Sequence, residues 1–429
     1  MVEKRKPIPV GEAVRKVMEY ARPGLKEMVP LECAYGRFLA EDLAADHEVP
    51  SFDRSPYDGF AIRAEDTLQA SSENPATFEV VGVIGAGSVF TETVGPYQAV
   101  RIMTGAQIPQ DCDAVVMLEL TNERRDHKKT YIEIKRMFKK GDNISFQGED
   151  VRKGEILAKR GTYISPGITA LLATFGYNEV PVAKKPVIGV LATGSELLDV
   201  NEPLEAGKIR NSNAYMILSQ IQRAGGEPVY FGKLNDDLES CISAVANALS
   251  KVDMLITTGG VSVGDFDYLP AIYEHLGASV LFNKVAMRPG SVTTVARYEH
   301  KLLFGLSGNP SACYVGFELF VHPAVRTYSF NDKPHLLKEE AILEEDFPKP
   351  NPFTRFVRAN LSYFDGRLIV KPSGFDKSSA VSSLAEANAL IVLPGGTRGY
   401  AKGMTVDVLL LEDNRGSEWP WENIVPSYK

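Results

Sequence analysis

The chain has 429 residues, of which 44% are hydrophobic and 24% charged, and its formal net charge is −8 at pH 7. These proportions are typical of globular chains and exclude a largely disordered or a membrane-embedded protein. At roughly 150 residues per domain the length predicts two to four domains, and the negative charge disfavours nonspecific binding to nucleic acid or anionic lipid.

The four cysteines, Cys33, Cys112, Cys241 and Cys313, are far apart and form no C-x-x-C pair. This spacing favours small buried thiols in a reducing compartment over a disulfide or a metal site. The first nine residues are basic but have no apolar core, and no window reaches the run of about 18 apolar residues that a membrane span requires. We therefore expect a cytoplasmic protein without a membrane segment.

The first predicted element is an amphipathic helix, because apolar residues recur at helical spacing over residues 10–21 and Arg22-Pro23 ends the pattern. Over residues 51–150, short β-branched runs alternate with Gly, Pro and Asp, which predicts a mostly β domain. Within it, residues 82–87 superficially resemble a dinucleotide-binding loop. The order of the glycines is wrong for that motif, so we interpret the segment as a β-turn.

Beyond Lys185 strands and helices alternate, with strands predicted at residues 186–193, 228–234 and 254–258. This alternation predicts an α/β domain with a parallel sheet and right-handed crossovers. Further strands are predicted at 279–287, 292–297 and 301–306, and the last leads into a helix that ends near Val325. A polar linker at 329–340 precedes a small all-β domain, in which Asp365-Gly366 predicts a hairpin, and the C-terminus is expected to be a loose tail.

Four loops that directly follow predicted strands carry glycines or polar side chains. Ligands bind outside the carboxyl ends of the strands in an open parallel sheet, so we expect these loops to share one edge. They are Thr193-Gly-Ser-Glu196, Asn235-Asp-Asp237, residues 258–267 and Ser307-Gly-Asn-Pro-Ser311. Each alone is more often a structural turn, but the four together favour a ligand site.

The loop at residues 258–267 reads Thr-Gly-Gly-Val-Ser-Val-Gly-Asp-Phe-Asp and follows an apolar strand. Its paired glycines, Gly259 and Gly260, bring main-chain N–H groups close to an anion without side-chain obstruction. Asp265 and Asp267 follow, and carboxylates beside a phosphate repel it unless a divalent cation bridges them. The segment therefore predicts a phosphorylated ligand that is handled with a hard metal ion such as Mg²⁺.

Lys284 and Arg288 are four residues apart in a run that we expect to be extended, which would place both on one sheet face as an oxyanion grip. From the spacing alone, exposed residues that protect a strand edge are an equally good interpretation. Asp58 and Asp150 are each compatible with turn formation. The sequence contains no convincing Ser-His-Asp or Cys-His arrangement, so no covalent nucleophile is indicated.

Six motifs occur in one order along the chain, and together they resemble the molybdopterin molybdenumtransferase family, the bacterial MoeA proteins and the E-domain of gephyrin. The resemblance covers nearly the whole sequence. The motifs are Pro56-Tyr-Asp58-Gly-Phe-Ala, Thr104-Gly-Ala-Gln-Ile-Pro-Gln-Asp-Cys-Asp113-Ala-Val-Val, Gly148-Glu-Asp150, Thr193-Gly-Ser-Glu196, Thr258-Gly-Gly-Val-Ser-Val-Gly-Asp-Phe-Asp267-Tyr and Ser307-Gly-Asn-Pro-Ser-Ala312.

The resemblance implies a multidomain α/β and β fold. It comprises a MogA-like parallel-sheet domain for molybdopterin at residues 1–26 and 179–327, a linking domain at 27–47 and 151–178, a β-rich domain at 48–150, a small C-terminal β-barrel at 328–415 and a tail at 416–429. The N-terminal helix would return to pack on the α/β domain. It further implies an elongated homodimer, with the pocket between one subunit's α/β domain and its partner's β-rich domain.

The implied reaction inserts molybdenum from molybdate into adenylylated molybdopterin and releases AMP, with Mg²⁺ as the cofactor. Other molybdenum cofactor synthesis proteins are expected as partners, and nucleic acid and membranes are not. The implied catalytic residues are Asp58, Asp150, Glu196, Asp236 and Asp267, of which Glu196, Asp236 and Asp267 would hold the metal. The implied substrate contacts are Thr104, Thr193, Gly194, Gly259, Gly260, Ser262, Lys284, Arg288, Pro289, Ser307, Asn309, Arg355 and Ser379.

Asp58, Thr104 and Asp150 would approach from the neighbouring subunit, and Lys284, Arg288, Arg355 and Ser379 would attract molybdate. The sequence departs from the commoner Lys-Pro-Gly-Lys pattern, because it reads Arg288-Pro-Gly-Ser291 and so has one positive charge fewer. Two alternatives stay open. A nucleotide hydrolase or deamidase could use the same α/β domain, although it would lack the Asp58 and Thr104 motifs, and a non-enzymatic scaffold would need an exposed partner groove.

Overall fold

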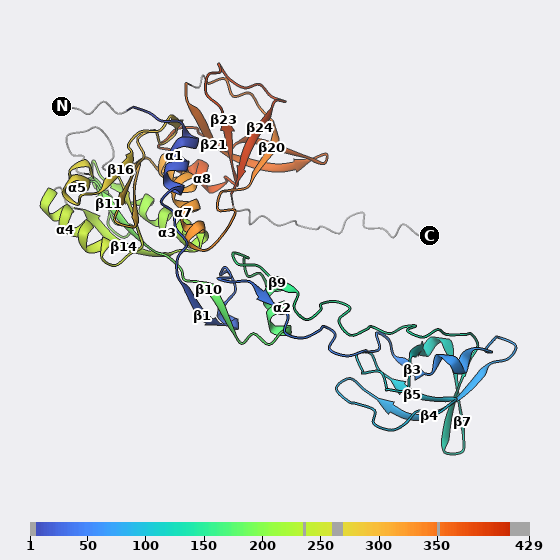
Figure 1. The fold of residues 1–429 in the computed structure, drawn as a ribbon. Helices are drawn as coiled ribbons and strands as arrows, with labels where there is room; N and C mark the ends of the chain where they lie inside the picture. The colour runs from blue at the N-terminus through green and yellow to red at the C-terminus, as the bar shows by residue number, and fades with distance from the viewer. Residues whose placement is uncertain (1–5, 235–236, 260–268, 350–351, 412–429) are drawn as a thin grey trace. The chain divides into compact units, whose positions relative to one another are not determined.

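The computed structural model describes residues 6–234, 237–259, 269–349 and 352–411 (Figure 1). The chain divides into two compact units, one of residues 1–41, 160–165 and 179–429 and the other of residues 42–159 and 166–178. Residues that we expected in one linking domain therefore occur in both. In the first unit β1 (Lys26–Pro30) pairs with β10 (Glu179–Ala183), and in the second β2 (Leu43–Ala44) pairs with β9 (Ile156–Ala158) near α2 (Pro166–Thr174).

The first unit contains a six-stranded sheet in the order β14-β11-β15-β19-β18-β16. Four neighbouring strands are parallel, namely β14 (Glu227–Leu234), β11 (Val187–Thr193), β15 (Met254–Thr258) and β19 (Lys301–Leu306), whereas β18 (Thr294–Tyr298) and β16 (Ser279–Phe282) run antiparallel to their neighbours. The predicted parallel sheet is thus confirmed for these four neighbouring strands, and β18 is the strand that runs against the other five. Only two residues separate β18 from β19, and so short a connection can join only antiparallel strands.

Helices cover both faces of this sheet (Figure 1). On one face lie α4 (Leu238–Leu249) and α5 (Leu269–His275), which pack on Leu191, Leu255 and Leu303. The other face carries α1 (Val10–Met18), α3 (Ser212–Ala224) and a long helix made of α6 (Pro310–Gly316), the π-helical turn η4 (Phe317–Val321) and α7 (His322–Tyr328). The two small strands β12 (Leu197–Leu198) and β13 (Ile209–Arg210) pair beside this layer. The implied return of the N-terminal helix to the α/β domain is confirmed, because Ala13 and Val17 are part of its core.

The predicted strand at residues 279–287 is divided between two sheets. β16 ends at Phe282, and β17 (Met287–Arg288) pairs instead with β21 (Thr354–Phe364) of the C-terminal domain. Between these two strands the chain forms main-chain hydrogen bonds with the N-terminal segment. The Ile8 N–H donates to the Lys284 carbonyl, and the Ala286 N–H donates to the Ile8 carbonyl. The expectation that Lys284 and Arg288 share one face of one strand is therefore wrong.

The C-terminal domain is a closed five-stranded barrel. Its strands are β20 (Lys338–Leu343), β21 (Thr354–Phe364), β22 (Arg367–Pro372), β23 (Ala389–Leu393) and β24 (Thr405–Leu410), and α8 (Ser382–Ala385) precedes β23. The order β21-β22-β20-β24-β23 closes because β21 also pairs with β23. Asp365 and Gly366, at φ 49° and 72°, form the predicted hairpin between β21 and β22 with the two positive φ angles of a type I′ turn.

The second unit is built on a six-stranded sheet in the order β6-β3-β5-β4-β8-β7. The strands are β3 (Gly59–Ile62), β4 (Ala76–Ile84), β5 (Gln98–Ile102), β6 (Ala114–Met117), β7 (Thr121–Asp126) and β8 (Lys129–Ile134), with 3-10 turns η2 (Ala64–Thr67) and η3 (Leu118–Leu120). The predicted β domain is confirmed. Gly82 lies inside β4 and a turn follows at residues 86–87, as the β-turn interpretation requires.

All four cysteines are free thiols. Cys112, Cys241 and Cys313 are buried as expected, but Cys33 is exposed. The expectation was wrong there because Cys33 ends the 3-10 turn η1 (Leu31–Cys33), in which no residue is buried. Across the described ranges, no helix has both the length and the apolar content to cross a membrane.

Candidate functional site: two cavities that share one loop

The described residues of three of the four predicted loops meet at the carboxyl edge of the α/β sheet, because these loops follow the neighbouring strands β11, β15 and β19. The Thr193 hydroxyl donates to the Thr258 carbonyl over 3.2 Å, and the Gly259 N–H donates to the Leu306 carbonyl over 3.1 Å. The predicted convergence of these loops is therefore observed. The remaining predictions of this edge, Asn235, Asp236, Gly260, Ser262, Asp265 and Asp267, lie outside the described residues.

A small cavity of about 70 Å³ opens between these loops, and we call it the loop cavity. Its lining comprises Thr193, Glu196, Leu197, Ile209, Arg210, Asn211, Ser212, Asn213, Thr258, Gly259, Gly308 and Pro310. Most of these residues come from the strand-following loops, and the rest come from β13 and the first turn of α3. The N-terminal end of a 13-residue helix thus faces the cavity, which favours an anionic ligand there.

The contribution of α3 to this cavity was not predicted from the sequence. Asn211 caps the helix by accepting from the Ala214 N–H, and the Asn213 side chain donates to Thr258 Oγ1 over 3.1 Å and to the Gly308 carbonyl over 2.9 Å. Asn213 Oδ1 is buried and accepts no hydrogen bond within the described ranges. The signal was the polar Asn-Ser-Asn immediately before the helical pattern, since such residues commonly begin a helix.

Glu196 is the one predicted metal-binding carboxylate that the described residues include, and it is exposed at the loop cavity. A Cβ built on Gly194 would lie 2.4 Å from Glu196 Oε2, so the carboxylate folds back over the main chain there. No described residue donates a hydrogen bond to it, and a free carboxylate suits a hard cation such as Mg²⁺. Across the described ranges, no group of three or more His, Cys, Asp or Glu residues could hold a metal.

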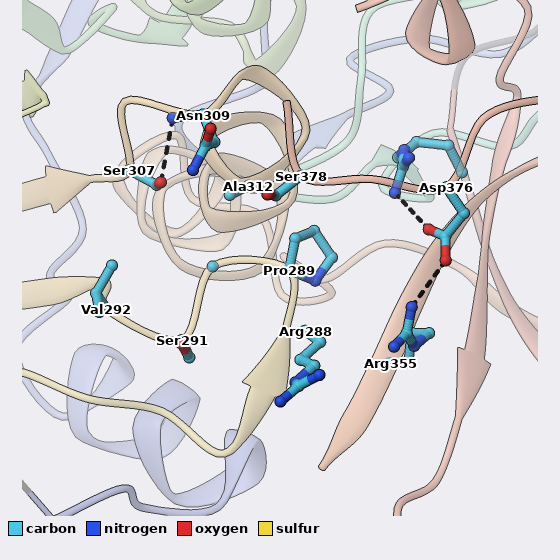
Figure 2. Close-up of a pocket in the computed structure, with 12 residues that line it drawn as sticks. Arg288, Pro289, Ser291, Val292, Ser307, Asn309, Ala312, Arg355, Asp376 and Ser378 are labelled. Atoms are coloured by element: carbon cyan, nitrogen blue, oxygen red, sulfur yellow. Dashed lines mark hydrogen bonds and ion pairs between the residues drawn. The ribbon is translucent and has the colours of Figure 1, made fainter. Parts of the chain in front are cut away.

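A larger cavity of about 340 Å³ lies between the α/β domain and the barrel (Figure 2), and we call it the arginine cavity. It is lined by Arg288, Pro289, Gly290, Ser291, Val292, Ser307, Asn309 and Ala312 from the α/β domain and by Arg355, Arg358, Asp376 and Ser378 from the barrel. Three guanidinium groups face one carboxylate, which leaves a formal excess of two positive charges. This lining suits a dianionic oxyanion.

The pairing of β17 with β21 explains how Arg288 and Arg355 converge. In this parallel register Arg288 is the partner of Arg355, so residues 67 positions apart enter the same cavity. Gly290, at φ 90°, then turns the chain beneath the cavity, where a Cβ would lie 2.7 Å from Met287 Cε. Arg288 thus shares the arginine cavity with Arg355.

Of the other predicted oxyanion contacts, Pro289, Ser307 and Asn309 line the arginine cavity, as does Ser291 at the position where a lysine is commoner. Lys284 does not line it. Ser379 is exposed and outside the lining, whereas its neighbour Ser378 is part of it.

Arg358 and Asp376 line the arginine cavity although nothing in the sequence indicated them. Burial acts to raise the pKa of Asp376, but Arg358, Lys349 and Arg355 together hold it below the ordinary value. Burial lowers the pKa of Arg358, and Asp376 opposes that shift. The pair is therefore ionised at neutral pH. Arg358 interrupts an otherwise apolar stretch of β21, and an arginine in such a position requires a partner.

Asp58 and Thr104 contact each other in the second unit. Asp58 Oδ1 accepts from the Thr104 N–H over 2.7 Å and from the Thr104 hydroxyl over 2.8 Å. These hydrogen bonds, the main-chain one first, lower the pKa of Asp58 and keep its exposed carboxylate ionised. Asp150 is also exposed, and its N–H donates to the Val49 carbonyl over 3.0 Å.

Three family models match consecutive parts of the chain. They are the MoeA N-terminal region (domain I and II) at residues 8–176, a probable molybdopterin binding domain at residues 189–327 and the MoeA C-terminal region (domain IV) at residues 340–411. The order of these matches agrees with the order of the folded regions.

Similar proteins cover the whole chain. A molybdopterin molybdenumtransferase of Bacillus subtilis is 62% identical over 429 residues, all of both chains, and one of Staphylococcus aureus is 52% identical over 97% of this chain and 99% of its own. A crystal structure of a molybdopterin biosynthesis MoeA protein from Pyrococcus horikoshii superposes with a TM-score of 0.80 at 33% identity, covering 94% of this chain and 100% of that one. The chain therefore belongs to the molybdopterin molybdenumtransferase family, whose members are transferases of molybdenum cofactor biosynthesis.

Proposed function

We propose that this protein inserts molybdenum from molybdate into adenylylated molybdopterin and releases AMP in a reaction that depends on Mg²⁺. The observation that carries the proposal is that one loop lines both cavities. Ser307 and Asn309 belong to the arginine cavity, whereas Gly308 and Pro310 belong to the loop cavity. Alternate residues of one loop thus bring an oxyanion site and a phosphate site side by side.

The arginine cavity would take molybdate. Its formal excess of two positive charges matches the charge of a tetrahedral dianion, and Arg288 and Arg355 offer several N–H donors in fixed planes. Ser307 and Ser378 add neutral donors. Tungstate has nearly the same size and charge, so this lining would accept it as well.

The loop cavity would take the pyrophosphate of adenylylated molybdopterin. The N-terminal end of α3 and the side chain of Arg210 provide positive potential at this cavity. Mg²⁺ held by Glu196, Asp236 and Asp267 would neutralise the negative charge that grows on the leaving phosphate. Cleavage of the phosphoanhydride bond needs only an attacking oxygen of water or molybdate, so no covalent nucleophile is required.

The proposal includes a homodimer in which Asp58, Thr104 and Asp150 of one copy approach the α/β domain of the other. The ionised Asp58 carboxylate, with one oxygen held by Thr104, keeps its second oxygen available to a ligand or metal. Other molybdenum cofactor synthesis proteins would supply the adenylylated substrate and accept the product.

The reaction is tested by incubating the purified chain with adenylylated molybdopterin, molybdate and Mg²⁺ under anaerobic conditions and measuring AMP. AMP release should require all three additions, and E196Q should reduce turnover by more than about 100-fold, because a charge aimed at the transition state is lost. The matched control is E202Q, since Glu202 pairs with Lys233 outside the loop cavity. Absence of AMP release would refute the proposal, and release without molybdate would favour a nucleotide hydrolase.

The shared site is tested by mixing two inactive variants. A heterodimer of E196Q and D58N chains contains one site with both changes and one with neither, so it should regain about half of the wild-type turnover if each site is shared between copies. A heterodimer as inactive as both parents would contradict the shared site while leaving the reaction itself intact.

A further inference from the structure

We propose that Asp376 is a positioning residue that orients Arg355 toward the oxyanion, and that the buried Arg358 anchors Asp376. This inference rests on the proposed function, because it assumes that the arginine cavity binds an oxyanion. It adds a pair of side chains that would act on the substrate only through Arg355.

Arg358 is the anchor because its donors are committed to the protein. It lies in the middle of β21 and is only 2% exposed. Its Nη1 donates to Asp376 Oδ1 over 3.1 Å, and its Nη2 donates to the carbonyls of Phe375 and Lys377 over 3.2 and 3.3 Å and to the Ser383 hydroxyl over 3.3 Å. A buried charge is tolerated only when its hydrogen bonds are satisfied. Arg358 therefore holds the segment around Asp376 in the position that provides these acceptors.

Asp376, which Arg358 holds in place, contacts Arg355 in turn. Its Oδ1 is occupied by Arg358, and its Oδ2 accepts from Arg355 Nη1 over 2.8 Å and from Lys349 Nζ over 3.1 Å. Figure 2 shows the contact between Asp376 and Arg355. Because a carboxylate only accepts hydrogen bonds, it would repel an oxyanion if it faced one. With both oxygens occupied by cations, Asp376 instead orients the arginine.

Arg355 is the residue whose orientation matters to the ligand. Its guanidinium is planar and has five N–H donors, so a contact that fixes Nη1 also fixes the direction of the remaining donors. The side chain is 13% exposed, lines the arginine cavity and lies opposite Arg288 in the β17–β21 pair. Without Asp376, Arg355 would lose the charged contact that fixes Nη1, and binding an oxyanion would then restrict its rotamers further.

The segment that carries Asp376 is also joined to the α/β domain. The Ser311 N–H donates to the Ser378 carbonyl over 3.0 Å, and the Ser311 hydroxyl donates to the Ala380 carbonyl over 2.7 Å. These contacts are independent of the charge on Asp376. An amide in its place therefore leaves the wall of the cavity attached while it removes the charged contact to Arg355.

The test is a double-mutant cycle on the full chain, with molybdate as the titrated ligand in calorimetry. D376N should weaken molybdate binding by at least about tenfold, because the Arg355 donors lose the charged contact that orients them, and R355A should weaken it by at least as much. In the R355A background, D376N should change the affinity by less than about twofold, because its effect acts through Arg355. Equal effects in both backgrounds would overturn the positioning role and make Asp376 purely structural.

Two further variants keep the result decisive. D407N removes the acid of an exposed ion pair with Lys338 on the same barrel and should leave molybdate affinity unchanged. Should D376N fail to fold, the same cycle is run with D376E, which keeps the charge but shifts it by one methylene, and the same coupling criterion applies. If R355A binds molybdate like the wild type, the proposed oxyanion site itself fails, whereas weak binding by R355A with normal binding by D376N refutes only the inference about Asp376.

Discussion

Replacing Gly259 with alanine tests the close approach of the loops after β11 and β15. Gly259 has a φ of 84°, and a Cβ built on it would lie 2.4 Å from the Thr193 carbonyl oxygen and 2.7 Å from Thr193 Oγ1. The nearer atom belongs to the main chain of the neighbouring strand, so no rotation of a side chain relieves the contact. The substitution should force the two loops apart and distort the loop cavity.

The expected cost has two parts. A left-handed φ costs a residue with a Cβ about 1–2 kcal/mol, and an atom forced into a packed site costs about 1–3 kcal/mol. G259A should therefore lower the local stability of the carboxyl edge of β11 and β15 by about 2–5 kcal/mol. Two controls separate the parts. Gly277 has a φ of 65° and nothing within 4 Å of a built Cβ, so G277A isolates the cost of the backbone angle. Gly308 has no positive φ and its nearest contact is 3.5 Å, so G308A should cost little.

Hydrogen exchange followed by mass spectrometry measures these costs locally, which suits a chain of several domains. Because about 1.4 kcal/mol corresponds to a factor of ten, G259A should accelerate exchange in peptides from β11 and β15 by at least about 30-fold. G277A should accelerate exchange only near the end of α5, and G308A should change it by less than about twofold in all peptides. Equal exchange in G259A and G308A would refute the proposed contact with Thr193.

Two further predictions concern stability against pH and the reactivity of thiols. Burial, with smaller contributions from Arg326 and Arg223, lowers the pKa of His322 to about 3. Between pH 3 and 6.5 His322 therefore binds a proton in the unfolded chain but not in the folded one. The free energy of unfolding should rise with pH in this range by up to about 1.4 kcal/mol per pH unit. Denaturation from pH 4 to 7 should show this slope in the wild type and a shallower one in H322Q, and identical slopes would contradict the assignment. Burial raises the pKa of Cys112 and of Cys313 to about 12, and Cys241 is also buried. A thiol reagent should therefore modify Cys33 alone until the protein unfolds. Rapid reaction of a second thiol in the folded protein would contradict the burial of the other three cysteines.

Local sequence patterns predicted the parts of the fold that are determined locally. β15 coincides with its predicted strand at residues 254–258, because a β-branched run ends there at paired glycines. The Asp365-Gly366 hairpin was predictable since its turn type requires positive φ angles. The edge shared by the strand-following loops was predictable because parallel strands point their carboxyl ends the same way.

Features that depend on distant segments could not be read from the sequence. The Ile8 main chain bonds to the segment before Met287 and ends the expected strand, so the partner of Arg288 became Arg355 rather than Lys284. Asp376 and Arg358 were missed for a similar reason, since their ion pair forms only when the segment after β22 returns over β21. Hydrophobic periodicity carries no information about such contacts.

Anomalous diffraction at the molybdenum absorption edge, on crystals grown with molybdate, locates the proposed oxyanion site. We expect one molybdenum peak inside the arginine cavity, within contact of Arg288, Ser307 and Arg355, and beside the loop that also lines the loop cavity. A molybdenum peak bound elsewhere in the protein, with this cavity free of molybdenum, would contradict it.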